Sequence, residues 1–405
     1  MHPVAITDFQ CISAAGADNS ALLNALFDNQ SRLAPLQLFT VPFTAMVGEV
    51  TQSLPEIRSE LKRYDCRNAQ LALAALNTGS FHSSVEQSIE RYGEQRVGVV
   101  IGTSTSGIYN SEAAYTYFNQ HGKMPDKFRF MHRHFVHATA EFIAQELALN
   151  GPCYAISTAC SSSAKTLAAA QRLINCGICD AVVVGGVDTL CRLTLYGFNS
   201  LDLIAEQHCT PMDQDRNGIN IGEAAGLLLL EVTTDDNHSA PQLLAVGESC
   251  DAHHMSAPHP SGDGAELAMR AALDSAGVAA DQVNYINLHA TASSLNDFAE
   301  AQAVQRVFGT DTPCSGLKGL LGHTLGASGA LETIVTLLAL QHDFLPGTCG
   351  LKTPDSRFQI NLLTEPQRAS QLNYAVSNAF GFGGNNASVL LSQTSLAQSN
   401  LEHKG

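Results

Sequence analysis

The sequence predicts an α/β fold, because short apolar β-branched runs alternate with alanine-rich stretches of helical length. The 32 glycines support this prediction, since they permit the tight turns and close packing of such folds. Hydrophobic residues make up 45% of the chain and charged residues only 15%, which excludes a disordered chain. A chain of 405 residues is long enough for two or three cores, or for one large body with a double core.

Six strands and six helices are predicted in alternation. The strands are Val97–Ile101, Cys153–Ile156, Ala181–Val184, Gly226–Glu231, Tyr285–Leu288 and Ala387–Ser392. The helices are Asn68–Leu76, Ala138–Leu149, Ser163–Ile174, Gly264–Ala276, Asp297–Phe308 and Gly329–Gln341. Such alternation indicates sheets whose faces are covered by helices. The polar stretch Thr233–Pro241 is the expected boundary between two halves of the chain.

The formal charge is −16, from 22 Lys and Arg against 38 Asp and Glu. This balance argues against nucleic-acid binding, which needs a basic surface, and against binding to anionic membranes. The eleven cysteines are odd in number and irregularly spaced, which predicts reduced thiols in a cytoplasmic protein. The N-terminus lacks the pattern of a signal peptide, and no apolar stretch has the length of a membrane span.

Cys160 is the candidate nucleophile. It follows a predicted strand, lies among small residues in the segment STACSSS, and precedes the helix that begins at Ser163. Unpaired amides at the start of a helix favour a thiolate, the reactive form of cysteine, and can bind a developing oxyanion. The alternative is a buried free cysteine that packs as a small apolar residue, which is the commoner case for a single thiol.

Two histidines favour the catalytic interpretation. His289 ends a predicted strand, and His323 lies in the glycine-rich segment GLLGHTLGASG, shortly after Lys318. A cysteine at a strand-to-helix turn together with two histidines in loops indicates nucleophilic catalysis more strongly than any of the three alone. A last glycine loop, SNAFGFGGNN, carries Phe380 and Phe382 and suits an apolar-walled approach of backbone to the site.

Together these segments resemble the elongating β-ketoacyl-acyl carrier protein synthases. STACSSS matches the nucleophile motif, LHATASSLND and KGLLGHTLGASGA match the two histidine motifs, and SNAFGFGGNNAS matches the terminal loop. CTPMDQDRNGINIGEAAG and DAHHMSAPHPSGDG also agree. The sequence departs from the family pattern at Ala224, Ala290, Ser294 and Asp188. These departures suggest a specialised member, of a polyene or polyketide pathway, rather than the housekeeping fatty-acid enzyme.

The resemblance implies a thiolase fold. Two similar α/β halves, residues 1–240 and 241–405, would stack as five α-β-α-β-α layers, with the active site at their junction. It also implies a decarboxylative condensation, in which an acyl group on Cys160 is extended by two carbons from malonyl-acyl carrier protein to give a 3-oxoacyl product. His289 and His323 would stabilise the enolate that forms when carbon dioxide leaves.

The same resemblance assigns supporting roles. The amides of Cys160 and Phe382 would form an oxyanion hole, and Phe382 would gate the entry of malonyl groups. Lys318, Glu300 and Glu332 would support the histidines through hydrogen bonds. No cofactor and no metal is required for this chemistry.

The implied partner is an acyl carrier protein that bears acyl and malonyl groups on phosphopantetheine. Carrier proteins are acidic, so a chain of charge −16 would bind them through a local basic patch. The chain has two candidate clusters for such a patch, Lys62, Arg63 and Arg67, and Lys127, Arg129 and Arg133. The alternative interpretation is that both clusters are ordinary solvated helix faces. We also expect a homodimer, or a heterodimer with a chain-length-factor paralog.

Two other functions stay open at this point. A non-catalytic chain-length partner would lack the cysteine, which is present here. A thiolase acting on coenzyme A thioesters would carry a second cysteine in its terminal glycine loop, and the last cysteine, Cys349, precedes that loop. Metal binding is disfavoured for two further clusters, since neither supplies four ligands. These are Cys176 with Cys179, and His132 with His134 and His137.

Overall fold

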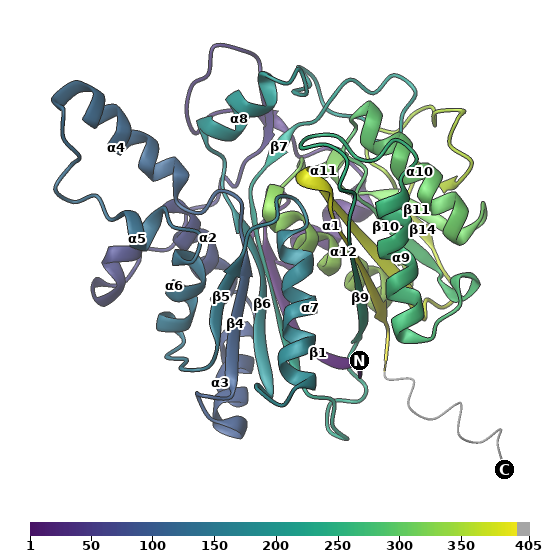
Figure 1. The fold of residues 1–405 in the computed structure, drawn as a ribbon, viewed down its shortest axis with the longest axis horizontal. Coiled ribbons are helices and arrows are strands. Elements are labelled where there is room, and N and C mark those ends of the chain that lie inside the picture. The colour runs from purple at the N-terminus through teal and green to yellow at the C-terminus, as the bar shows by residue number, and fades with distance from the viewer. Residues whose placement is uncertain (395–405) are drawn as a thin grey trace.

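The computed structural model describes residues 1–394, and its main feature is a mixed sheet of eleven strands (Figure 1). The N-terminal part of this sheet contains, in spatial order, β5 (Cys153–Ile156), β4 (Val97–Gly102), β6 (Ala181–Asp188), β8 (Ala224–Glu231) and β1 (Val4–Ile12). The strands β5, β4 and β6 are parallel, whereas β8 is antiparallel to both β6 and β1.

The C-terminal part repeats this arrangement. It contains β9 (Gln242–Cys250), β16 (Asn385–Ser392), β15 (Tyr374–Gly381), β10 (Tyr285–Leu288), β11 (Pro313–Gly316) and β13 (Asn361–Leu362). A short antiparallel pairing of β1 with β9 joins the two parts. We number the five strands of each part by their order along the chain and leave β13 aside. From the junction outwards, both parts then have the same spatial order, 1-5-4-2-3. The repeated order supports the division of the chain near residue 240, which stays a prediction.

Helices form three layers around the two parts of the sheet (Figure 1). The central helices α7 (Ser162–Asn175) and α12 (Ser328–His342) share one core with side chains from both parts. The outer helices of the N-terminal part are α2 (Arg67–Leu76), α3 (Phe81–Tyr92) and α6 (Ala138–Glu146). Those of the C-terminal part are α9 (Asp263–Ala276) and α10 (Ser294–Phe308). The predicted α/β fold with five α-β-α-β-α layers is confirmed.

Burial explains the composition of the central elements. Every residue of β6 and β8 is buried, and α12 is buried from Ser328 to Leu340. Elements that are covered on both faces expose no polar side, so valine, leucine and alanine occupy successive positions. Glycine lets the two central helices approach closely, because a Cβ on Gly329 would lie 2.7 Å from the amide nitrogen of Ala164 on α7.

All six predicted strands and all six predicted helices are present, with ends that differ by up to four residues. Of the strands in the main sheet, the sequence prediction omits β1, β9, β11, β13 and β15. In β1 the polar residues Thr7, Asp8 and Gln10 interrupt the apolar pattern, so the strand is recognisable only from its pairing with β8.

Shorter elements connect these layers. The remaining helices are α1 (Asn19–Asp28), α4 (Ile108–His121), α5 (Phe130–Arg133), α8 (Arg192–Asn199) and α11 (Lys318–Leu321). The remaining strands are β2 (Ala34–Pro35), β3 (Met46–Gly48), β7 (Ile221–Gly222), β12 (Phe344–Leu345) and β14 (Gln367–Arg368). The 3₁₀ helices are η1 (Ser59–Tyr64), η2 (Ala280–Gln282), η3 (Leu325–Ala327) and η4 (Phe382–Gly384). Within residues 1–394 we find no helix with the length and apolarity needed to cross a membrane.

Candidate active site

Four loops converge where the two parts of the sheet meet. Cys160 follows β5, His289 follows β10, His323 lies between β11 and α12, and Phe382 follows β15. Cys160 and His323 occupy matching places, because each lies between the third strand of its own part and a central helix. The ligand atoms of Cys160, His289 and His323 all lie within 4.8 Å of one another. The fold therefore brings together the three residues that the sequence predicts as catalytic.

Cys160 lies on a sharp turn at the start of α7. Ala159, directly before it, has a φ of 54°, a left-handed conformation that residues with a Cβ rarely adopt. The loop after β15 passes close to this turn, and a Cβ on Gly381 would lie 3.2 Å from the amide nitrogen of Cys160. The cysteine side chain is buried, with 6% of the residue exposed. Glycine at position 381 thus lets the two loops meet at the nucleophile.

Burial raises the pKa of the Cys160 thiol to about 11. The charge of Lys318 and hydrogen bonds from the amides of Phe382 and Cys160 lower the same pKa, but they do not outweigh burial. The resting thiol is therefore protonated at neutral pH, which differs from the expectation that the helix N-terminus favours a thiolate. Because both amides reach the sulfur, they could also bind an oxyanion on an attached acyl group.

His323 contacts the nucleophile directly. Its Nε2 lies 2.9 Å from Sγ of Cys160, and its Nδ1 accepts a hydrogen bond of 3.3 Å from the amide of Leu325. A ring nitrogen that accepts carries no proton, so the proton of the neutral ring is on Nε2 and faces the sulfur. Burial and then the charge of Lys318 lower the pKa of His323 well below its usual value, which keeps the ring neutral.

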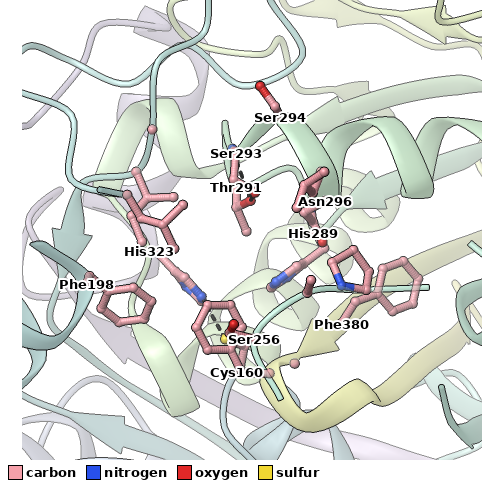
Figure 2. A pocket seen from close by; sticks show the side chains of 18 of the residues that line it. Cys160, Phe198, Ser256, His289, Thr291, Ser293, Ser294, Asn296, His323 and Phe380 are labelled. Carbon is pink, nitrogen blue, oxygen red and sulfur yellow. Dashed lines mark hydrogen bonds between the residues drawn. The ribbon is translucent and has the colours of Figure 1, made fainter. Parts of the chain in front are cut away.

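His289 has the same tautomer for a different reason. Nζ of Lys318 lies 3.2 Å from Nδ1 of His289 and also donates to the backbone carbonyl of that residue. An ammonium group can only donate, so Nδ1 accepts and the ring proton is on Nε2. Burial, and then the charge of Lys318, lower the pKa of His289 well below its usual value, and a proton on His323 would lower it further. The centroids of the two histidine rings are 5.3 Å apart, and both rings point towards Cys160 (Figure 2).

Two buried carboxylates hold the histidine side of the site. Glu332 on α12 forms an ion pair with Lys318, and each side chain is 1% exposed. Glu300 on α10 accepts hydrogen bonds of 2.7 Å from the amides of His289 and Ala290, so it holds the backbone of His289 rather than its ring. Burial raises the pKa of Glu300 to about 8 and also raises the pKa of Glu332. Lys318 and Glu300 therefore contact His289, whereas Glu332 contacts Lys318, and the catalytic roles of all three stay predictions.

Cysteine and histidine are ligands that zinc prefers, so the arrangement of Cys160, His289 and His323 must be considered as a metal site. A metal would bind through the nitrogens that face the sulfur. Both of these Nε2 atoms carry protons, because Lys318 and the amide of Leu325 donate to the opposite nitrogens. The donor set therefore opposes a metal, and the absence of one stays a prediction with this physical reason.

A cavity of about 340 Å³ surrounds the reactive atoms, and Cys160, His289 and His323 contribute to its wall (Figure 2). The rings of Phe198 on α8 and of Phe382 bound it, with centroids 5.5 Å apart. Sequence reasoning gave no role to several further lining residues, among them Phe198, Thr291, Ser293 and Asn296. The last three lie in the quoted LHATASSLND motif, which was a usable signal, whereas nothing in the sequence around Phe198 indicated a role.

The two predicted basic clusters form one surface, with one exception. Arg133 on α5 donates to the backbone carbonyls of Lys62 and Arg63 on η1, so the two segments are in contact. Lys127 and Arg129 directly precede α5 and are exposed. We call Lys62, Arg63, Lys127, Arg129 and Arg133 the basic surface.

The exception is Arg67, and here the sequence prediction needs correction. Its guanidinium group binds both carboxylate oxygens of Glu223 and the carbonyl oxygen of Val50, and its side chain is only 14% exposed. Glu223 also accepts hydrogen bonds from the amides of Val50 and Leu190. The charge of Arg67 is therefore neutralised inside the protein and is not available to a partner.

The clusters that the sequence analysis disfavoured as metal sites are separated in the structure. His132, His134 and His137 pack individually against the rings of Tyr64, Phe130 and Phe135. Cys179 is buried and Cys176 is exposed, and both are free thiols. Within residues 1–394, Cys160, His289 and His323 form the one group of three or more residues whose ligand atoms could share an ion.

A buried thiol beside two neutral histidines, at the junction of a duplicated five-layer α/β fold, defines an acyl-transferring enzyme with a thiolase fold. Family profiles described as "Beta-ketoacyl synthase, N-terminal domain" and "Beta-ketoacyl synthase, C-terminal domain" match residues 1–236 and 242–352. The chain belongs to the β-ketoacyl synthase family of acyltransferases.

Individual relatives agree with this assignment. The chain is 35% identical over 310 residues to a 3-oxoacyl-[acyl-carrier-protein] synthase 2 of Rhizobium meliloti, covering 73% of each chain. It is 28% identical to the protein of the same name from Vibrio harveyi, covering 96% of this chain and 97% of that one. A chain from the solved complex of the ketosynthase ApeO with its chain length factor ApeC, from Xenorhabdus doucetiae, superposes with a TM-score of 0.88. That chain is 38% identical, and the match covers 96% of this chain and 98% of that one.

Proposed function

We propose that this protein condenses an acyl thioester with malonyl-acyl carrier protein, releasing carbon dioxide and forming a 3-oxoacyl-acyl carrier protein two carbons longer. One observation carries the proposal: the ligand atoms of Cys160, His289 and His323 lie within 4.8 Å of one another, and the donors at Nδ1 of both rings place the ring protons on Nε2. One nucleophile and two neutral donors at one point suit a reaction that forms an acyl-enzyme and an enolate in the same place. The relatives named 3-oxoacyl-[acyl-carrier-protein] synthase 2 support the same reaction.

In the first step the sulfur of Cys160 attacks the carbonyl carbon of the acyl thioester. A new carbon–sulfur bond forms, the bond to the carrier thiol breaks, and the proton of Cys160 ends on that thiol. The amides of Cys160 and Phe382 bind the charge that develops on the carbonyl oxygen. The hydrogen bond from Nε2 of His323 stabilises the thiolate while it attacks.

In the second step the malonyl thioester loses carbon dioxide. The bond between its carboxylate and the adjacent carbon breaks, and the electron pair forms an enolate. The Nε2 protons of His289 and His323 bind the enolate oxygen. The enolate carbon then attacks the acyl carbon, Cys160 leaves as a thiolate, and the thiolate takes up a proton from solvent. Every bond change uses groups of this chain, the two substrates and one proton from solvent, so no cofactor is required.

The cavity and the basic surface support an acyl carrier protein as the partner. The hydroxyl oxygens of Thr291 and Ser293 lie 2.9 Å apart in the cavity wall and can bond to the amide groups of a phosphopantetheine arm. The basic surface supplies cationic side chains on a protein whose net charge is −16. We therefore propose this surface as the docking site of an acidic carrier.

A second subunit is the other proposed partner, either another copy of this chain or a chain-length-factor paralog. β5 ends the main sheet, so one of its edges offers unpaired backbone groups to another strand. The ApeO complex and the solved ishigamide ketosynthase/chain length factor, 26% identical with a TM-score of 0.89, support the heterodimer. Native mass spectrometry of the chain, alone and with a cysteine-less paralog, distinguishes the two. All eleven cysteines are free thiols, which fits the cytoplasmic location that we propose.

Intact-mass spectrometry tests the proposed reaction. The protein is incubated with acyl-acyl carrier proteins bearing saturated, unsaturated or aryl chains, and then with malonyl-acyl carrier protein. We expect an acyl adduct on Cys160, no adduct on the Cys160→Ser variant, and a 3-oxoacyl product only with malonyl groups. An absence of adducts from every carrier contradicts the condensing function, and extension by an acetyl thioester would indicate a thiolase. The chain that is extended fastest identifies a fatty-acid or a polyene pathway.

A further inference from the structure

Asp188, at the end of β6, is a buried carboxylate that the proposed reaction does not use. It is 0% exposed, and among residues 1–394 no basic side chain forms an ion pair with it. Burial raises its pKa, and hydrogen bonds from neutral groups lower it. Burying a carboxylate without a cation costs folding free energy unless neutral donors form hydrogen bonds to it. A fully hydrogen-bonded group of this kind makes the structure around it rigid.

The two oxygens of Asp188 bind different loops. Oδ1 accepts hydrogen bonds from the hydroxyl groups of Thr103 and Thr105, at 2.6 and 2.8 Å, and from the amide of Thr105 at 2.8 Å. The amide of Ser104 lies 2.9 Å from both oxygens. Oδ2 accepts a hydrogen bond of 2.6 Å from the amide of Gly326. The carboxylate therefore joins the loop after β4 to the loop that precedes α12.

Each of these loops is connected to the neighbourhood of a reactive residue. The hydroxyl of Ser104 donates to the carbonyl of Ala159, directly before Cys160, at 3.2 Å. Gly326 follows Leu325, whose amide binds Nδ1 of His323. Ala159 and Leu325 both have left-handed backbones, with φ of 54° and 53°. Strained residues of this kind keep their conformation only where neighbouring contacts fix them. Here Ser104, which binds the carbonyl of Ala159, and Gly326, which follows Leu325, both bind the carboxylate of Asp188.

We propose that Asp188 is a positioning residue that fixes the turn of Cys160 and the loop of His323 relative to each other. It sets the contact between Sγ and Nε2 without touching the substrate. Asp188→Asn keeps the size of the side chain but turns one acceptor into a donor that faces amide donors. Both loops would then lose their common anchor, while the cavity wall and the basic surface stay unchanged.

The test compares Asp188→Asn with Asp188→Glu, which keeps the carboxylate, and with a matched control, Glu231→Gln. Glu231 is a buried carboxylate at the opposite end of the same strand pair, and it accepts a hydrogen bond from Ser88 at 2.9 Å. For condensation we expect Asp188→Asn to lower kcat at least tenfold with KM for malonyl-acyl carrier protein within twofold. Asp188→Glu should recover part of kcat, and Glu231→Gln should retain it. All rates are normalised to the folded fraction, measured by circular dichroism.

A wild-type kcat in Asp188→Asn, a loss shared equally by Glu231→Gln, or a rise in KM alone overturns the proposal. If Asp188→Asn does not fold, Ser104→Ala removes only the link to Ala159 and should still lower kcat. Because this inference rests on the proposed function, a second readout is independent of condensation: the rate of iodoacetamide alkylation at Cys160, followed by peptide mass spectrometry. We expect at least a threefold change in that rate for Asp188→Asn and none for Glu231→Gln, even if wild-type protein condenses no substrate.

Discussion

Lys318 shows how one residue determines the chemistry of another that is distant in the sequence. Its ammonium group donates to Nδ1 and to the carbonyl of His289, and it forms an ion pair with Glu332. It also lowers the pKa of both histidines and of the Cys160 thiol. A single buried cation thus selects the tautomer of His289 and adds to the burial that keeps both histidines neutral, as the proposed enolate chemistry requires.

The first prediction concerns this cation. Lys318→Met leaves Glu332 buried without a partner and should destabilise the fold by about 3–5 kcal/mol. The double variant Lys318→Met/Glu332→Leu should regain most of that stability, since no unpaired charge remains. Condensation should stay at least tenfold slower in the double variant, because nothing fixes the tautomer of His289. Thermal unfolding and a carbon dioxide release assay measure both effects, and a fully active double variant would contradict the role of Lys318.

The second prediction concerns pH and Glu300. Burial raises the pKa of this carboxyl from 4.5 to about 8, so the folded protein holds its proton more tightly than the unfolded chain does. The resulting stability is fully present below pH 4.5 and is lost as pH rises through 8. Glu300→Gln cannot ionise. Between pH 6 and 8 its free energy of unfolding should therefore rise relative to wild type by about 1.4 kcal/mol per pH unit.

Urea unfolding at several pH values measures this difference. Glu231→Gln serves as the control, because it removes a buried carboxylate outside the site. A flat difference between Glu300→Gln and wild type from pH 6 to 8 would show that the amides of His289 and Ala290 keep Glu300 ionised throughout.

At the scale of elements, the site depends on how closely the loop after β15 approaches the start of α7. The amides of Phe382 and Cys160 lower the pKa of the Cys160 thiol, and Gly381, directly before Phe382, lies against the turn that carries Cys160. A Cβ there would lie 3.0 Å from the carbonyl oxygen of Thr158 and 3.2 Å from the amide nitrogen of Cys160. Backbone atoms of the turn that carries Cys160 would have to shift by a few tenths of an ångström, which would disturb the proposed oxyanion hole.

The third prediction follows from this approach. Gly381→Ala should lower the rate of Cys160 acylation at least tenfold, since a displaced amide no longer binds the developing oxyanion. Gly197→Ala is the matched control, because a Cβ at this α8 position has no neighbour within 4 Å and alanine favours a helix. The control should acylate at the wild-type rate. Stopped-flow quenching with intact-mass detection compares them, and equal rates for the two variants would refute the argument.

At the scale of the whole molecule, charge is distributed unevenly. The chain carries a net charge of −16, yet η1 and α5 bring the five residues of the basic surface together. The helices α4 and α5 extend away from the sheets at the left of Figure 1. We therefore propose the basic surface as the region that attracts an acidic partner, an effect that salt would screen.

The fourth prediction tests this surface. Arg63→Glu/Arg129→Glu should raise KM for carrier-bound substrates at least fivefold and leave the rate with a small thioester unchanged. Arg91→Glu on α3, at the bottom of Figure 1, changes charge outside the surface and should alter neither rate. Arg67 is unsuitable for this test, because it pairs with Glu223. Steady-state kinetics at low and high salt provide the measurement, and equal losses with both substrates would contradict docking.

The sequence predicted the reactive residues of the site, but it did not predict their protonation states or the segments that pack around them. Cys160, His289 and His323 stand in local segments whose residue types already indicate nucleophilic chemistry. The contact of Ser104 with Ala159 and the role of Phe198 in the cavity wall had no local signal, because each depends on packing between segments distant in the chain. The two basic clusters were predicted separately, and only the fold showed that they form one surface without Arg67.

By itself the sequence determined the α/β alternation, the three reactive side chains and the family, because each of these is encoded in short segments. Only the tertiary structure decided the protonation states of those side chains. The protonated thiol of Cys160 and the neutral rings of His289 and His323 result from burial and from one cation. Desolvation and hydrogen-bond partners depend on what packs around a group, and that is fixed when both parts of the sheet close on the central helices.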